Sequence, residues 1–368
     1  MKFRIIAVMF LTVAATGNAA GEGVDLSVVN RIKDEAFNHS QVMVYMHHLA
    51  DENGPRLAAS PAYQRAARWA VETLQASGIS DARLEPFGEF GRSWAWTGIS
   101  VQMVEPQKTT LNAVPLAWSS GTNGTINANV VYAPLWDDIS DPQQGDLVRL
   151  AERIDSYKAQ NAGRLGGKFV LLSGKRPFKL PSEPEIQRWS ESDLAGMQTA
   201  REPVTSDVYE WPLLRMHLGD PRTMELKPEQ EKFSVYFNID TGSGKARGVL
   251  TQGNDMVKPI FGGLMQPFIE NGVSMLVPRN DWGTDHQAFD AIGLPAFDLL
   301  QDQLDYWSHT HHSNVDTVDH VLPQDLMVSA AFMATLMYDA ATRKQMMPRE
   351  PLPRALPEPS PLPDILLE

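Results

Sequence analysis

The sequence predicts an α/β fold, with a mostly parallel sheet flanked by helices and a β-rich inserted subdomain. The last part of the chain alternates short apolar runs with helical periods, as in strands joined by crossover helices. The middle of the chain changes to short β-like runs separated by turns. The length of 368 residues suits one large domain or two modest ones.

Two helices are predicted in the N-terminal part of the chain. The first covers residues 29–51, where apolar residues recur at helical spacing, and the Asn-Gly-Pro run at 53–55 ends it. The second begins at Pro61, a residue type favoured in the first helical position, with Ser60 as the N-cap. Gly78 can take the left-handed conformation that closes such a helix.

The middle of the chain predicts short strands around one helix. Residues 99–104 and 128–132 are β-like runs, and residues 146–161 have a helical period. Residues 168–173 form an apolar run that is typical of a buried strand. Residues 177–212 carry many charges and no clean period, which predicts a loop with some helix.

The last part of the chain predicts the alternation on which the fold class depends. It predicts strands at residues 233–239, 274–277 and 295–300. It predicts a helix at 257–271 between the first two strands and a long apolar helix at 324–341 after the last. After Met347 the chain holds seven prolines, which predicts an extended tail outside the folded part.

The N-terminus resembles an export signal. Lys2 and Arg4 supply positive charge, residues 5–15 are mostly apolar, and small residues at 17–20 fit a cleavage site. The apolar run is too short to anchor the chain in a bilayer. We therefore expect an exported protein, periplasmic or secreted, with no membrane anchor.

Composition excludes several classes of function. The formal net charge of -13 would repel a phosphate backbone, so nucleic acid is excluded as a partner. The chain has no cysteine, which excludes disulfides, thiolate metal ligands and a thiol nucleophile. Any metal would have to be held by histidine, aspartate or glutamate.

Histidines outside the C-terminal region favour structural interpretations. His39, His47 and His48 lie on the first predicted helix, where a pair such as His47 and Asp51 is more often a solvated face than a metal site. His217 precedes a Gly-Asp-Pro run that is typical of a turn.

A denser group of metal-binding residue types occupies the C-terminal region. Asp285 and His286 precede one predicted strand, and His311 and His312 follow it, before Asp316. Open α/β sheets place ligands at the carboxyl ends of their strands, which favours metal binding here. Asp285 and Asp316 could orient a ligand histidine by accepting from its second ring nitrogen.

Asp240 is the remaining candidate. It ends the predicted strand at 233–239 and is followed by a Thr-Gly-Ser-Gly turn, residues 241–244. Its position at the end of a strand fits two interpretations equally well. The side chain enters a shared site, or the aspartate only forms the turn.

Taken together, these motifs resemble the co-catalytic di-zinc exopeptidase family. That family includes bacterial aminopeptidases and plasma glutamate carboxypeptidase (carboxypeptidase Q). The matching stretches are residues 53–57, 60–61, 84–87, 90–92, 219–228, 237–240 and the C-terminal histidine region. The resemblance implies a zinc-exopeptidase-like fold, and residues 111–180 resemble an inserted lid-like subdomain.

The resemblance also implies roles for single residues. In the family, two zinc ions share a bridging aspartate and act on peptide or dipeptide substrates. By resemblance, Asp240 matches the terminal aspartate on one zinc ion, and His312 matches the histidine on the other. Asp285 and His286 match a loop that lines the site, with His311 and Asp316 beside it.

The departure from the family pattern is as informative as the match. The His-x-Asp motif, the bridging aspartate and the Glu-Glu pair have no counterpart, and no Glu-Glu dipeptide occurs in the sequence. A hydrolytic zinc ion needs about three protein ligands and a water molecule with a nearby base. We therefore name no catalytic residue and expect at most partial zinc occupancy, with an incomplete sheet.

Three interpretations follow from this departure. The chain is an impaired zinc exopeptidase, a catalytically silent relic or peptide-binding pseudoenzyme, or a product of an internal deletion that is not stable. The predicted division is a signal peptide (1–20), two parts of a peptidase domain (21–110 and 217–346), an inserted subdomain (111–180), an irregular junction (181–216) and a tail (347–368).

Overall fold

The computed structural model describes residues 24–86, 88–89, 91–136, 144–174, 180, 182–199, 227–279, 284–290 and 292–349. The predicted signal peptide, His217, the matching stretch at 219–226 and the tail from residue 350 lie outside the described residues.

A four-stranded sheet forms the centre of the molecule. Its strands are β5 (Tyr236–Asn238), β6 (Ala246–Leu250), β7 (Met275–Val277) and β8 (Ala296–Gln301), in the order β5-β8-β6-β7. The pairs β5/β8 and β6/β7 are parallel, and β6/β8 is antiparallel. The α/β fold is therefore confirmed, with one antiparallel pair in a sheet that was expected to be mostly parallel.

The sequence did not predict β6. Arg247 and Gly248 interrupt its apolar run, so the pattern lacks a clean strand period. The structure explains the glycine, because a Cβ atom at position 248 would lie 1.8 Å from the carbonyl oxygen of Met275. Gly248 lets β6 and β7 approach closely enough to pair.

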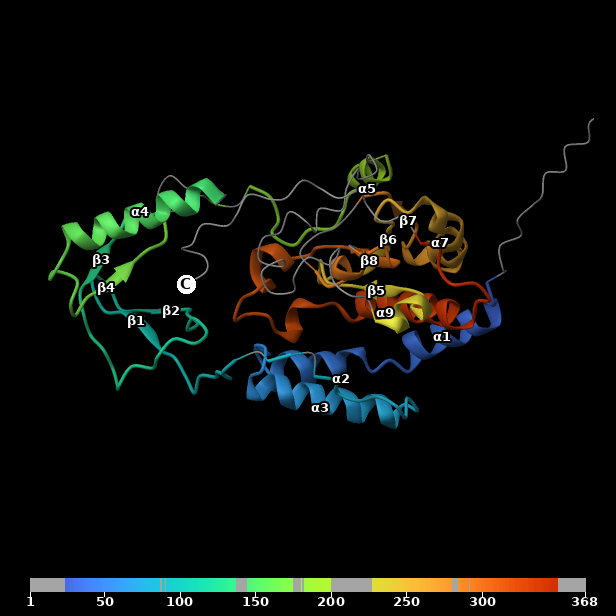
Figure 1. Cartoon of the computed structure of the whole chain (residues 1–368), viewed down its shortest axis with the longest axis horizontal. Coiled ribbons are helices and arrows are strands. Elements are labelled where there is room, and N and C mark those ends of the chain that lie inside the picture. The colour runs from blue at the N-terminus through green and yellow to red at the C-terminus, as the bar shows by residue number, and fades with distance from the viewer. Residues whose placement is uncertain are drawn as a thin grey trace, which may run out of the picture.

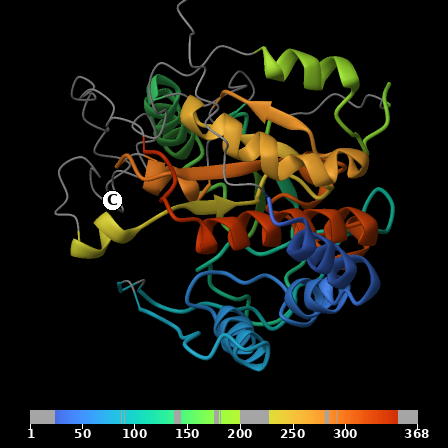
Figure 2. The ribbon, with the colours of Figure 1, turned by 90° about the vertical axis from the view of Figure 1, so that its right-hand side faces the viewer.

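Three helices cover one face of the sheet. They are α1 (Leu26–Asn38), α7 (Lys258–Met265) and α9 (Pro323–Thr342), and α1 and α9 lie side by side in Figures 1 and 2. The core between them and the sheet is built from fully buried side chains, among them Val29, Val249, Phe261, Phe297 and Phe332. No helix in the described ranges is long and apolar enough to cross a bilayer.

The opposite face of the sheet is covered by α5 (Glu191–Gln198). Leu194 of α5 is buried against Leu250, Met275 and Leu300 of the sheet. Ser190 caps the helix, because its hydroxyl accepts from the Asp193 backbone N–H at 3.2 Å. The charged segment predicted as loop with some helix thus supplies the second helical layer.

A buried carboxylate fastens this segment to the sheet. Asp302 is fully buried and accepts hydrogen bonds from Arg188 Nη1 (2.7 Å), Arg247 Nη1 (3.3 Å) and the Trp189 backbone N–H (3.2 Å). Arg188 Nη1 also pairs with Asp325 at 2.8 Å, and the bonds to Asp325 and then Asp302 raise the pKa of its guanidinium.

The predicted helix over residues 29–51 is wrong as a single element. The chain forms α1, then α2 (Val42–Met46), then a π-helical turn, η1 (His47–Glu52). Residues 38–41 contain no apolar side chain to continue the buried stripe, and His39 leaves helical geometry with a φ of -128°.

The helix predicted to begin at Pro61 is confirmed. It is α3 (Pro61–Ala76), and the Ser60 hydroxyl accepts from the Tyr63 backbone N–H at 3.1 Å. Gly78 has the expected positive φ of 98° just beyond its end. Local capping chemistry was therefore sufficient to place both ends of this helix.

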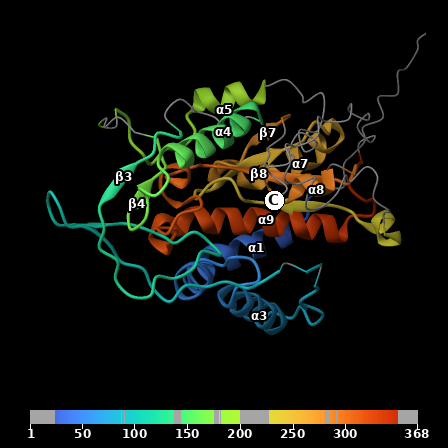
Figure 3. The same ribbon diagram turned by 60° about the vertical axis from the view of Figure 1, so that its left-hand side comes forward.

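The remaining strands form a separate lobe beside the sheet (Figures 1 and 3). In it, β1 (Val101–Met103) pairs antiparallel with β2 (Thr109–Leu111). The strands β3 (Val130–Tyr132) and β4 (Phe169–Leu171) are parallel and are joined through α4 (Gln144–Gln160). The boundary predicted between residues 110 and 111 falls inside β2, and the division into domains stays a prediction.

Short elements complete the connections. They are η3 (Pro228–Lys232), η4 (Asp255–Val257), η5 (Gln266–Asn271), α8 (His286–Asp290), η6 (Tyr306–Thr310) and η7 (Val318–His320). The helix predicted at 257–271 is therefore α7 followed by the 3-10 turn η5.

Two neighbouring positions on α9 test the core. Leu336 is fully buried, whereas the Met337 side chain is 59% exposed. Leu336→Ala should lower the free energy of unfolding by about 2–5 kcal/mol because it leaves a cavity, and Met337→Ala should change it by less than about 0.5 kcal/mol. Urea denaturation of both variants measures the difference, and equal losses would contradict this packing.

The buried carboxylate gives a second test. Asp302→Ala leaves Arg247, 13% exposed in its side chain, without its buried partner, so the free energy of unfolding should fall by about 3 kcal/mol. Asp155→Ala removes a surface pair with Lys158 and should cost less than about 1 kcal/mol. Thermal and urea denaturation compare the two; a neutral Asp302→Ala would show that the junction is not held by this carboxylate.

Candidate functional site

The end of β5 and the middle of β8 meet in a network of polar side chains. Asp298 is fully buried and accepts from Asn238 Nδ2 at 2.9 Å and from the Thr241 hydroxyl at 3.2 Å. Asn238 Nδ2 also donates to the Thr284 hydroxyl at 2.8 Å. The parallel pairing places Asn238 opposite Asp298, so three separate segments are tied together at this edge.

Asp240 lies exposed just beyond this network. Its charge acts on two side chains from different parts of the chain, Tyr236 and His311. Burial raises the pKa of the Tyr236 hydroxyl, and the carboxylates of Asp285, Asp240 and Asp298 raise it further. These effects place Asp240 and Asp285 around the same tyrosine.

The two adjacent histidines occupy a tight turn after η6. Their rings stack with centroids 3.9 Å apart, and His311 also contacts Trp307 at 4.7 Å. His312 is exposed and has a positive φ of 54°, a conformation that costs a residue with a β-carbon roughly 1–2 kcal/mol. The turn is held by backbone bonds from His311 N–H to Tyr306 at 2.8 Å and from Ser313 N–H to Thr310 at 3.2 Å.

Electrostatics connect this turn with the end of β5. Burial and the neighbouring His312 lower the pKa of His311, and the carboxylate of Asp240 acts in the opposite direction. The charge of Asp240 therefore reaches His311, and His312 stacks on the His311 ring.

The other predicted site residues have different surroundings. His286 is fully buried at the start of α8, and Asp285 before it is exposed. Phe289 of α8 stacks on Tyr236 with ring centroids 4.6 Å apart. Asp316 is exposed in the segment between the histidine turn and η7. The α8 loop therefore lines the tyrosine rather than surrounding a ligand histidine.

The described donor set does not fit two zinc ions. A hydrolytic zinc ion takes about three protein ligands and a water molecule. Among the residues that the structure describes, no group of three or more histidine, aspartate or glutamate side chains is arranged to hold a metal ion. Asp240 and His312, the two ligands that the resemblance implies, therefore belong to no such group within the described residues.

Histidines of the N-terminal part form pairs with nearby carboxylates. His47 Nδ1 lies 2.7 Å from Asp51 Oδ2, and His48 Nδ1 lies 2.5 Å from Glu52 Oε2. The His47 side chain is 56% exposed, in keeping with a solvated face. Asp51 also accepts from the Val318 backbone N–H at 3.0 Å, which fastens η1 to η7.

Known proteins resemble this chain in sequence over part of its length. Carboxypeptidase Q from Bos taurus is 28% identical over 123 residues, which are 33% of this chain and 26% of that protein. Carboxypeptidase Q from Homo sapiens is 28% identical over 109 residues, 30% of this chain and 20% of that protein. The match therefore spans about a quarter of the curated relatives, and no protein-family model matches the chain.

A solved structure resembles the chain over nearly its whole described length. The Peptidase M28 precursor from Shewanella amazonensis SB2B superposes with a TM-score of 0.50 at 16% identity, covering 88% of this chain and 98% of that chain. The chain is similar to carboxypeptidase Q in sequence and to a peptidase M28 precursor in fold. These similarities bear out the predicted exopeptidase resemblance and the α/β fold class. The roles of single residues stay predictions.

Sequence reasoning missed the buried residues of the network at the end of β5. Asp298 stands in the middle of the apolar strand β8, and a charged residue in such a run is rarely buried without a partner. That signal could have identified Asp298. Nothing in the local sequence marks Asn238 or Thr284 as its companions, since the contacts join residues 46 and 60 positions apart.

The proximity of Asp240 and His311 can be measured directly. Asp240→Asn should lower the pKa of His311 further, because the carboxylate that favours the protonated ring is removed. Imidazole chemical shifts followed by NMR across a pH titration report that pKa. Asp319→Asn is the matched control, since its carboxylate acts on His320. An unchanged His311 pKa in Asp240→Asn would show that the two side chains do not interact.

Proposed function

We propose that this chain is an exported member of the zinc-exopeptidase group that retains a peptide-binding site but is impaired in hydrolysis. The observation that carries the proposal is the donor set. The described residues include Asp240, His311 and His312, but no described group of three or more histidine, aspartate or glutamate side chains is arranged to hold a metal ion.

The missing base supports the same proposal. Attack on a peptide carbonyl needs a water molecule activated by a carboxylate within hydrogen-bond reach. The family supplies it from a Glu-Glu pair, and this sequence contains no such pair. A chain with half of the ligands and no base would bind a substrate without cleaving it.

Binding of one metal ion is compatible with this function. By resemblance, Asp240 would be a ligand of one zinc ion and His312 a ligand of the other, and a bound zinc ion would supply Lewis acidity toward a carbonyl oxygen. His311 would limit the ring position of His312 through stacking. Export is part of the proposal through the signal-like residues Lys2 and Arg4 and the apolar run at 5–15.

Zinc content and hydrolysis test the proposal together. The purified protein should bind less than about one zinc ion per chain and should not hydrolyse aminoacyl-anilides, because a stable hydrolytic site takes about three protein ligands. Elemental analysis and a chromogenic assay measure these two properties. Two zinc ions per chain with steady hydrolysis would overturn the proposal.

Single substitutions locate any metal that does bind. His312→Ala should reduce zinc binding, and any residual hydrolysis, by at least about 10-fold because it removes a ligand. His47→Ala should leave both near their starting values, since that side chain is paired on an exposed turn. Calorimetric zinc titration compares the two variants, and equal effects would show that the metal binds elsewhere.

A further inference from the structure

The strand β5 is an outer strand of the central sheet. In the order β5-β8-β6-β7, β8 is its only partner strand within the described residues. Tyr236 and Phe237 of β5 are partly exposed, whereas all six residues of β8 are buried. The helix α8 lies over both strands, and its Phe289 stacks on Tyr236. Among the described elements, the side of β5 that points away from β8 is therefore an open edge of the sheet.

The backbone of this open edge has unused hydrogen-bonding groups. The Tyr236 N–H donates to the Pro295 carbonyl at 2.9 Å, on the side of β8. Because successive residues of a strand face opposite ways, the N–H and C=O groups of Phe237 point away from β8, in line with those of Val235 and Ile239. None of these three residues forms a backbone hydrogen bond with a described residue. Such a row of unpaired groups can receive another extended chain.

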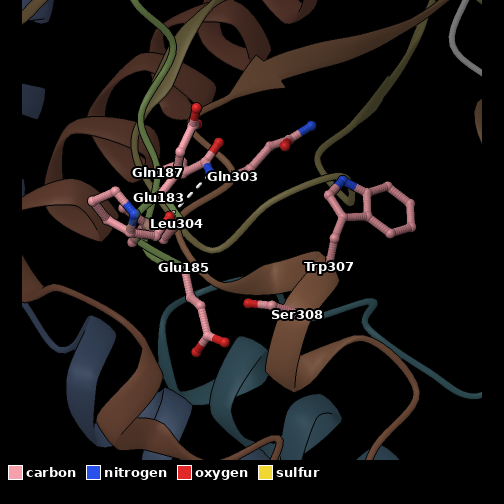
Figure 4. Close-up of a pocket in the computed structure, with 8 residues that line it drawn as sticks. Glu183, Glu185, Gln187, Gln303, Leu304, Trp307 and Ser308 are labelled. Atoms are coloured by element: carbon pink, nitrogen blue, oxygen red, sulfur yellow. Dashed lines mark hydrogen bonds between the residues drawn. The ribbon is translucent and has the colours of Figure 1, made fainter. Parts of the chain in front are cut away.

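Backbone beyond the end of β8 is covered by the chain itself. The Gln187 N–H donates to the Leu304 carbonyl at 3.1 Å, and the Leu304 N–H donates to the Gln187 carbonyl at 2.7 Å. Figure 4 shows these two residues side by side. The junction segment thus acts as an added strand at that place, and β5 has no such neighbour within the described ranges.

The sequence of β5 lacks the usual protection of an outer strand. Outer strands commonly carry lysine or proline, which discourage pairing with another chain. Residues 233–239 contain no proline and no charged residue, and most of them are aromatic or β-branched. The Phe237 ring is anchored in the core, with centroid distances of 6.2 Å to Phe261 and 6.4 Å to Phe297. The open edge is therefore already ordered for pairing, which reduces the entropy lost on binding.

Two exposed carboxylates lie at the carboxyl end of the open edge. Asp240 follows β5 directly along the chain, and Asp285 precedes α8, the helix that packs on β5. Burial raises the pKa of the Tyr236 hydroxyl, and the charges of Asp285 and Asp240 raise it further, so both carboxylates act on β5. A chain added along β5 passes beside them, which favours a basic side chain at that place.

We propose that the open edge of β5 binds an extended peptide as an added strand, with a basic side chain of the peptide beside Asp240 and Asp285. The proposal rests on the peptide binding proposed above and names its mode and the class of peptide. In complexes of this kind main-chain hydrogen bonds supply the affinity, and side chains supply the preference. The net charge of -13 also favours the approach of a basic peptide.

Hydrogen exchange tests the mode of binding. The probe is an acetylated and amidated heptapeptide of alternating threonine and valine with one lysine. At saturating peptide, exchange of the Phe237 and Ile239 N–H groups should slow at least about 10-fold, because each gains a carbonyl acceptor. NMR on the full chain resolves single amides. The Trp189 N–H, which already donates to Asp302, should keep its rate and serves as the internal control.

A variant of the open edge gives an independent test. Ile239→Pro removes one N–H and should weaken binding of the heptapeptide roughly 3- to 10-fold, as for the loss of one hydrogen bond. Ile239→Val keeps that N–H and should bind as the unaltered chain does. Calorimetry gives the affinities, and circular dichroism verifies folding. If Ile239→Pro does not fold, exchange at Phe237 in the unaltered chain decides.

Peptide and protein substitutions test the charge preference. Replacing the peptide lysine with norleucine should weaken binding roughly 2- to 5-fold, the range for one exposed charge pair. Asp285→Asn should reduce this difference, whereas Glu72→Gln, an exposed carboxylate on α3, should leave it intact. Equal affinity for the two peptides would overturn the preference for a basic side chain.

The outcomes separate this proposal from the proposed function. A peptide that binds without slowing exchange at Phe237 overturns the added strand and leaves the impaired peptide-binding protein standing. Two zinc ions per chain with steady hydrolysis overturn the proposed function, while protection of Phe237 by the peptide still supports the added strand. If no peptide binds, both retained peptide binding and the added strand are overturned. In that case, a dimer in sedimentation that Ile239→Pro converts to a monomer would assign the open edge to a second copy of the chain.

Discussion

The buried carboxylate of Asp302 holds the two halves of this architecture together. It is itself fully buried and receives bonds from Arg188 and Trp189 on the junction segment and from Arg247 on β6. Burying a charge is costly unless it is paired, so the junction and the sheet need each other in this arrangement. Beside this contact α5 covers one face of the sheet, and Gln187 forms a backbone bridge with Leu304.

The candidate site depends on a different feature, the parallel pairing of β5 with β8. That pairing sets Asn238 against Asp298 and directs the following turn, with Asp240, toward the histidines after η6. The result is a polar network at the end of β5 with Asp240 just beyond it. Strand pairing does not depend on a bound metal, so it fixes these positions whatever chemistry the site carries.

Elements governed by local chemistry could be predicted from the sequence, and those governed by distant contacts could not. Ser60, Pro61 and Gly78 determine α3 through capping alone. In β6, Arg247 and Gly248 interrupt the apolar pattern because of distant contacts. Arg247 pairs with Asp302, and Gly248 leaves room for the backbone of Met275. Likewise Asp240 and His312 could be proposed from motifs, but their supporting residues are known only once the strands are paired.

The close contact at Gly248 carries a consequence for evolution. Because even a methyl group there would overlap the main chain of the adjacent strand, substitution is blocked whatever the function of the protein. Selection at this codon therefore acts through assembly of the sheet. Among homologous genes, glycine at this position should mark the lineages that still build the sheet, separately from any marker of catalysis.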